Sequence, residues 1–246
     1  MHLERIFFIR SDRLGEFILS LPAIKLIKEN YPTSKIFLLA KKDNINLVKR
    51  SGFIDYFFEY KEDFFKGLKG SFRLANILKK EKIDCVISLN PKKEFHFASF
   101  LGGVSIRVGY DRKWGFCLNK KISDKKYLEN KHEIEYNIDL VQLICKRVFI
   151  PQVELPIDKK ESLNFLKKEI DLEKDYIVLY PFTSSIFKKI ERSFWINLIN
   201  HIRREIRKDI VLIGHEEEVG ESRILEEKSN VINPVGSLSI KNLAAF

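Results

Sequence analysis

The residues best suited to chemistry lie in one short polar segment, Arg10 to Glu16, between an apolar run and a helical pattern. Two carboxylates in it, Asp12 and Glu16, could take a proton from a hydroxyl group. Two cations, Arg10 and Arg13, could attract an anionic ligand. Each has a structural alternative, because acidic residues also stabilise the first turn of a helix and arginines also occupy solvated surfaces. Gly15 suits the turn under either interpretation.

The neighbouring elements place this segment at the edge of a sheet. The run Ile6–Ile9 is uninterrupted and apolar, which predicts a strand buried on both faces. From Phe17 onward, apolar residues recur at helical spacing, as at Leu21 and Ile24. In an open parallel sheet, the carboxyl edge binds ligands because strand-to-helix loops converge there.

The rest of the chain alternates strands with helices, which indicates an α/β fold with parallel sheets. The strands predicted in the first half are Lys35–Ala40, Ile54–Tyr60, Asp84–Leu89 and Arg107–Tyr110, followed by one long amphipathic helix, Glu133–Val148. A second set has strands at Tyr176–Tyr180, Asp209–Ile213 and Val231–Asn233, and helices at Phe194–Arg207 and Glu217–Lys228.

A proline-containing stretch, Phe149 to Asp158, interrupts the helical pattern and is the best linker. We therefore predict two domains, 1–150 and 151–246. The last residues, Leu-Ala-Ala-Phe246, have neither a polar last turn nor a glycine cap. We expect the chain to end inside its second domain, which leaves that domain incomplete and the activity of the chain open.

Composition narrows the class of protein. With 246 residues and 45% hydrophobic residues the chain can bury a core, and no stretch has the length and apolarity of a membrane span or signal peptide. The net charge of +10 favours an anionic partner, either a nucleotide, a glycolipid, a membrane surface or nucleic acid. The three cysteines and the isolated histidines have no metal-ligand spacing. We expect a cytoplasmic protein.

Six motifs in order resemble one family, the ADP-heptose:lipopolysaccharide heptosyltransferases of glycosyltransferase family 9. The match covers nearly the whole chain. The motifs are the Ile9–Glu16 turn, Leu21-Pro22, Arg107–Tyr110, His132 before a helix, Pro181–Lys188 with Phe194-Trp195, and Val211–Gly214 followed by Asn233–Ser239. Three departures stand out. Glu16 replaces the family's usual aspartate, Ile190 replaces a frequent tryptophan, and the family's later Asp-Ser/Thr-Gly and His segment has no counterpart in this sequence.

The resemblance implies a GT-B fold, in which two Rossmann-like domains bind the acceptor and the sugar nucleotide. It implies a glycosyltransferase that moves a heptose from ADP-heptose to the lipopolysaccharide inner core, with inversion and without a cofactor or metal. Glu16 would be the general base. The resemblance assigns the nucleotide diphosphate to Thr183, Ser184, Ser185 and Lys188, and the acceptor to Arg10, Asp12, Arg13, Gly15 and His132.

The implied partners are a nucleotide-sugar donor and an anionic glycolipid acceptor. Peripheral contact with the cytoplasmic face of the inner membrane is an open alternative, and we expect no nucleic acid because no nucleic-acid module is recognisable.

Two other functions remain open. A dinucleotide-dependent enzyme would fit the opening strand and helix, but the first turn lacks G-x-G-x-x-G. A truncated, inactive transferase remnant that binds carbohydrate, nucleotide or another anionic partner would fit the basic charge and the predicted incomplete end.

Overall fold

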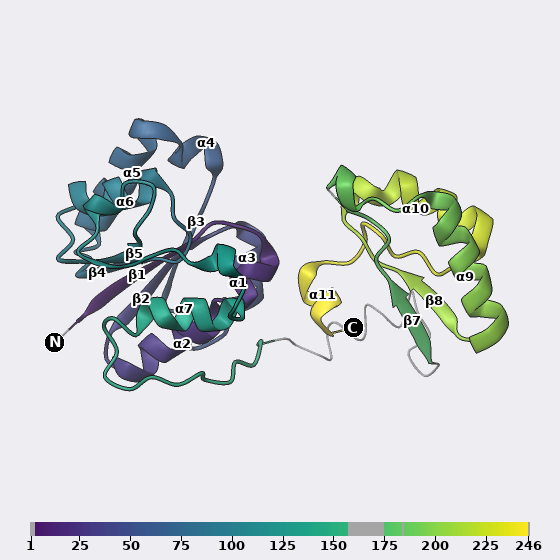
Figure 1. Cartoon of the computed structure of the whole chain (residues 1–246), viewed down its shortest axis with the longest axis horizontal. Coiled ribbons are helices and arrows are strands. Elements are labelled where there is room, and N and C mark those ends of the chain that lie inside the picture. Colours follow the sequence, from purple (N-terminus) through teal and green to yellow (C-terminus); the bar gives the residue numbers. More distant parts are fainter. Residues whose placement is uncertain (1–2, 157–174, 184, 246) are drawn as a thin grey trace. The chain divides into compact units, whose positions relative to one another are not determined.

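The computed structural model describes residues 3–156, 175–183 and 185–245. The described residues form two compact units, one before residue 157 and one after it (Figure 1). No helix in this described part of the chain combines the length and apolarity needed to cross a bilayer.

A six-stranded parallel sheet forms the centre of the first unit, in the order β3-β2-β1-β4-β5-β6. Its strands are β1 (Arg5–Arg10), β2 (Lys35–Ala40), β3 (Tyr56–Glu59), β4 (Cys85–Ser88), β5 (Ile106–Tyr110) and β6 (Lys120–Ile122). The central strands have buried apolar interiors, such as Ile6–Ile9 and Ile36–Ala40, because helices cover both faces, as predicted for a parallel α/β sheet. All six carboxyl ends therefore meet at one edge.

Two helical layers enclose this sheet (Figure 1). The helices are α1 (Leu14–Ile18), α2 (Leu21–Asn30), α3 (Lys42–Val48), α4 (Glu62–Phe65), α5 (Gly67–Lys80), α6 (Lys93–Leu101) and α7 (Glu133–Val141). Helices α5 and α6 pack on one face, where Leu74, Leu78 and Phe95 join Phe7 and Ile9 of β1 in a common core. Helices α2 and α7 lie together on the opposite face. Side chains alternate along a strand, so Arg10 shares the α7 face rather than the α5 face.

Two helix predictions need correction. The helix predicted from Phe17 is interrupted, because Ser20 hydrogen-bonds Phe17 O and begins α2, with a proline in its first turn. Helix α7 ends at Val141 rather than Val148. Its continuation is replaced by tertiary bonds, since Asn30 Oδ1 accepts from Lys146 N and Arg147 N, both at 2.9 Å.

The second unit also alternates strands with helices, with fewer of each described. Strands β7 (Tyr176–Leu179) and β8 (Asp209–Leu212) pair in parallel, and one bridge joins Val211 to Ile232. Its helices are α9 (Arg192–Ile206), α10 (Val219–Ser229) and α11 (Ile240–Ala245), with short 3-10 turns η3 (Ile186–Lys188) and η4 (Glu216–Glu218). Ile199, Ile210 and Leu225 form its core. The predicted α/β class with parallel sheets is confirmed.

Candidate active site

Glu16 lies in the first turn of α1, just beyond the carboxyl end of β1. Its side chain is half-buried, and the next residue, Phe17, is fully buried and fixes the helix against the core. The carboxylate makes no hydrogen bond or ion pair with any residue that the structure describes. Both oxygens are therefore free to accept a proton or a hydroxyl hydrogen bond.

Arg10 is the last residue of β1, and its side chain is only 1% exposed. Its Nη1 donates to Leu89 O at 3.0 Å, and its Nη2 donates to Glu133 Oε1 at 3.2 Å. Its Nε lies 2.9 Å from Asp12 Oδ1, an ion pair whose angle falls outside that of a hydrogen bond. A buried cation requires such partners, since desolvation otherwise makes it costly. Arg10 thus connects β1, the end of β4 and α7.

Asp12 is held against this guanidinium in a half-buried position. Burial raises the pKa of Asp12 above its ordinary value, while Arg10 and, more weakly, Lys126 oppose that rise. The nearby Glu16 charge adds to the rise, so the two carboxylates are electrostatic neighbours. Arg13, by contrast, is exposed, and Gly15 has open space around its Cα.

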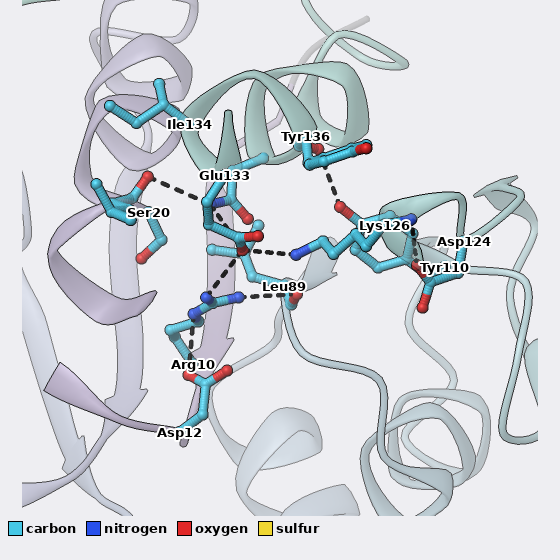
Figure 2. Close-up of polar contacts among 12 residues, drawn as sticks. Arg10, Asp12, Ser20, Leu89, Tyr110, Asp124, Lys126, Glu133, Ile134 and Tyr136 are labelled. Atoms are coloured by element: carbon cyan, nitrogen blue, oxygen red, sulfur yellow. Dashed lines mark hydrogen bonds and ion pairs between the residues drawn. The ribbon is translucent and has the colours of Figure 1, made fainter. Parts of the chain in front are cut away.

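Two residues that the sequence did not indicate complete this cluster (Figure 2). Glu133, the first residue of α7, accepts from Arg10 and from Lys126 Nζ, the latter at 2.5 Å. The Lys126 ammonium also lies over the Tyr110 ring, 5.1 Å from its centroid. Glu133 is 123 positions from Arg10, so no local pattern could pair them.

Asn90 anchors the other side of the turn. Its Oδ1 accepts from Ser11 N at 3.2 Å, and its Nδ2 donates to Ser11 Oγ at 3.0 Å. Asn90 lies two residues after the end of β4, which neighbours β1 in the sheet. A polar residue directly after the predicted strand Asp84–Leu89 was the available signal for this contact.

His132 is the N-cap of α7. Its Nδ1 accepts from Ile134 N at 3.3 Å, and its backbone N–H donates to Glu135 Oε2 at 2.8 Å. His132 and Glu135 therefore form a capping box. The ring is exposed. The structure brings Arg10, Asp12 and Glu16 together in one turn and places His132 at the start of the helix that supplies Glu133.

A basic cavity of about 560 Å³ lies at the same sheet edge. Its wall comes from segments that follow β3, β4 and β5, and includes Tyr60, Lys66, Lys92, Lys93, Lys113 and Trp114. Two glutamates also line it, so the four lysines leave a net charge of +2 (4 − 2). None of these lysines lies within 4.0 Å of a carboxylate in the described chain.

The wall of this cavity contains two consecutive left-handed residues. Lys113 has φ of 47° and Trp114 has φ of 70°, values that L-residues seldom adopt. The fully buried His96 holds this turn, its Nδ1 lying 3.1 Å from Lys113 O. Burial lowers the pKa of His96, so the ring is neutral near pH 7 and Nδ1–H is the donor.

In the second unit, the predicted nucleotide residues follow β7. Thr183 Oγ1 accepts from Ser185 N at 3.2 Å, which closes the turn before η3. Lys188 is exposed and has no side-chain partner in the part of the chain described, whereas Lys189 pairs with Glu221 at 3.2 Å. Ser184 lies outside the described residues.

Within residues 3–156, 175–183 and 185–245, no group of three or more His, Cys, Asp and Glu side chains could hold a metal ion.

Comparison with known proteins bears on what these two sites do. No protein-family model matches the chain. A putative glycosyltransferase of Haemophilus influenzae is 26% identical over 243 residues, covering 94% of this chain and 68% of the relative. Lipopolysaccharide heptosyltransferase 3 of Escherichia coli is 22% identical over 185 residues, covering 71% of this chain and 53% of the relative.

Solved structures agree with these relatives. A family 9 glycosyl transferase from Veillonella parvula superposes with a TM-score of 0.81 at 18% identity, covering all of this chain and 73% of its own. E. coli ADP-heptose lipopolysaccharide heptosyltransferase II gives 0.74 at 16% identity, with 98% and 75% covered. The resemblance to the family 9 heptosyltransferases is confirmed. The predicted GT-B fold class is confirmed with it, and the chain is a glycosyltransferase relative.

Proposed function

We propose that this protein is a glycosyltransferase that moves a heptose from ADP-heptose to an anionic glycolipid of the lipopolysaccharide inner core. The names of the relatives support the transferase class. An E. coli heptosyltransferase solved with ADP superposes at a TM-score of 0.70 and 17% identity, covering 98% of this chain. The observation that carries the catalytic proposal is the half-buried Glu16 carboxylate at the carboxyl edge of the sheet, which has no partner among the described residues.

The proposed reaction is a direct displacement with inversion. An acceptor hydroxyl oxygen forms a bond to the anomeric carbon while the bond from that carbon to the ADP oxygen breaks. Glu16 takes the hydroxyl proton as the nucleophile attacks. Asp12 is ion-paired with Arg10, whereas neither oxygen of the Glu16 carboxylate has a partner among the described residues.

We propose that the leaving diphosphate is stabilised by protein cations rather than by a metal. Lys188 is exposed and unpaired within the described chain, so its ammonium can contact a phosphate without breaking another interaction. Lys189 would first have to leave Glu221. Thr183 and Ser185 would shape the adjoining turn.

The acceptor is proposed to bind the first unit. The basic cavity presents lysines for a carboxylate or phosphate and the half-exposed face of Trp114 for a sugar ring. Arg10 is proposed to act through position rather than by contact, because its guanidinium is buried and already bonded.

Turnover with ADP-heptose and a Kdo-bearing acceptor tests the proposal. Glu16→Gln should keep the fold and ADP binding but lower turnover by about 10²-fold or more, since a general base is worth that much. Glu29→Gln, an exposed carboxylate on α2, is the matched control and should leave turnover unchanged. Turnover of Glu16→Gln within a few-fold of the parent would refute the assignment. ADP binding without any turnover by the parent chain would favour the binding remnant.

A further inference from the structure

The turn after β5 holds two large side chains in a backbone conformation that they seldom adopt. Lys113 and Trp114 are both left-handed, whereas the adjacent Gly115 is not. The glycine serves another purpose, because a Cβ there would lie 2.4 Å from Asp111 Oδ1. A turn with only a structural role would have glycine or asparagine at its left-handed positions. The lysine and tryptophan side chains are therefore kept in spite of the strain, which indicates that the side chains themselves are used.

Both side chains reach the wall of the basic cavity. Lys113 and Trp114 line this cavity, and Trp114 also lines a smaller hollow of about 300 Å³ beside it. The Trp114 side chain is 39% exposed, so part of the indole is open to a ligand. Successive Cα atoms are about 3.8 Å apart, so one sugar ring can lie on the indole while its acidic group meets the Lys113 ammonium.

His96, in α6, is the buried group that bonds to this turn. Its side chain is fully buried, and Nδ1–H donates to Lys113 O at 3.1 Å. Burial lowers the pKa of His96, and backbone hydrogen bonds with Lys113 and Arg112 oppose that fall. The start of the same helix supplies Lys92 and Lys93 to the cavity wall. His96 therefore ties one wall of the cavity to another.

The surroundings leave room for the imidazole and little room for movement. A Cβ added at Gly109 of β5 would lie 3.2 Å from His96 Nε2 and 2.8 Å from Leu118 Cδ1, so the glycine makes space for the ring. Phe97, the next residue of α6, meets the Trp114 ring edge-on, with centroids 5.4 Å apart and an angle of 85°. The helix thus fixes both the backbone and the indole of the turn.

We propose that His96 is a positioning residue for acceptor binding. Through Lys113 O, it holds the turn in the conformation that presents the Lys113 ammonium and the Trp114 ring to the same acidic sugar. The inference rests on the proposed function, in which this cavity takes the acceptor. His96 touches no ligand itself, because its side chain is fully buried.

Binding of free Kdo by the whole chain tests the role of the turn, with Trp114 as the fluorescent reporter in a Trp195→Phe background. Lys113→Gly should weaken Kdo binding at least about tenfold, because a charge-assisted contact is lost. It should keep or raise the urea midpoint, since glycine adopts the φ of 47° without strain. Lys82→Gly is the matched control, because Lys82 is exposed, has a φ of 46° and lies outside the cavity. It should bind Kdo like the parent.

Two amide substitutions test His96. The amide nitrogen of asparagine reaches the place of Nδ1 and can still donate to Lys113 O, whereas that of glutamine reaches the place of Nε2, beside Gly109. His96→Gln should weaken Kdo binding about tenfold, and His96→Asn should stay within about threefold of the parent. Acrylamide quenching of Trp114 should rise in His96→Gln and not in His96→Asn. In turnover, His96→Gln should raise the acceptor KM and leave kcat within about twofold.

Ser99→Ala separates positioning from stability. Ser99 is buried in the same helix and donates to His96 O at 2.7 Å. This variant should lower the urea midpoint without changing Kdo binding.

Three results would overturn the inference: Kdo binding of equal strength in His96→Gln and His96→Asn, parent-like binding by Lys113→Gly, or no response of Trp114 to Kdo in the parent. Kdo binding by a chain that transfers no heptose would contradict the proposed function alone. Heptose transfer with the same acceptor KM in both His96 variants would contradict this inference alone.

Discussion

Replacing Arg10 by methionine should destabilise the first unit strongly. The substitution keeps a long unbranched side chain but removes a guanidinium that is 1% exposed and bonded to Leu89 O, Glu133 and Asp12. Breaking a buried ion pair from one side typically costs about 3–5 kcal/mol, because the remaining charge stays buried. Lys126 still neutralises Glu133 in the variant, so we expect the lower end, about 3 kcal/mol.

Urea unfolding monitored by tryptophan fluorescence measures this loss. The chain has two tryptophans, one in each unit, so a Trp195→Phe background leaves Trp114 to report on the first unit alone. Arg13→Met is the matched control, because Arg13 is exposed and makes no side-chain contact with described residues. Its free energy of unfolding should change by less than about 0.5 kcal/mol.

The pH dependence of the Arg10→Met loss adds a second check. Burial already raises the pKa of Asp12, and Arg10 opposes that rise, so its removal raises the pKa further. A carboxyl with a raised pKa binds a proton more tightly when folded, so the folded state gains stability as pH falls through that pKa. The deficit of the variant should therefore shrink in mild acid. A loss below about 1 kcal/mol, or one equal to that of Arg13→Met, would refute the structural role of this cation.

Three further predictions concern other parts of the molecule. Lys188→Ala should weaken ADP binding by about 1.5–3 kcal/mol in calorimetry and Lys189→Ala much less; equal effects would point to bulk charge. Burial lowers the pKa of His96 below 6.5, so its contribution to the free energy of unfolding should be full above pH 6.5 and should fall as the pH drops from 6.5 toward the folded pKa. A urea midpoint that rises in acid would contradict this. Gly70→Ala should destabilise the first unit, since an added Cβ would lie 2.1 Å from the Phe65 backbone. A Cβ added at Gly220 would have no atom within 4 Å, so Gly220→Ala should be neutral or stabilising. Equal urea midpoints for the two variants would show that the Phe65 backbone moves aside.

The sequence predicted the buried strands well because burial on both faces leaves an uninterrupted apolar run. Lys35–Ala40 was predicted at the bounds that β2 has, and Ile6–Ile9 falls within β1. Strand β6 was missed for the opposite reason. It is an edge strand whose first two residues are exposed lysines, so its pattern is that of a solvated loop.

The site was predictable where it depends on neighbours in sequence and not where it depends on packing. Asp12 and Glu16 lie in the short polar segment after the first strand, which placed both at the sheet edge. The pairing of Arg10 with Glu133 depends on how α7 packs beside β1. The two residues are 123 positions apart, so no local sequence pattern indicates that they meet. Arg10 was expected to attract an anionic acceptor from the surface, and the structure instead places its side chain in the interior.

This buried position explains how one short turn can hold two carboxylates in different surroundings. Strand alternation puts Arg10 on the α7 face with Ile6 and Phe8, both fully buried, so its charge needs acceptors from nearby elements. The turn supplies Asp12 and α7 supplies Glu133. Asp12 is thereby committed to structure, and its neighbour Glu16 keeps both oxygens open within the described chain. A general base needs a free lone pair, so the pairing of Asp12 with Arg10 supports the proposal that Glu16 is the base.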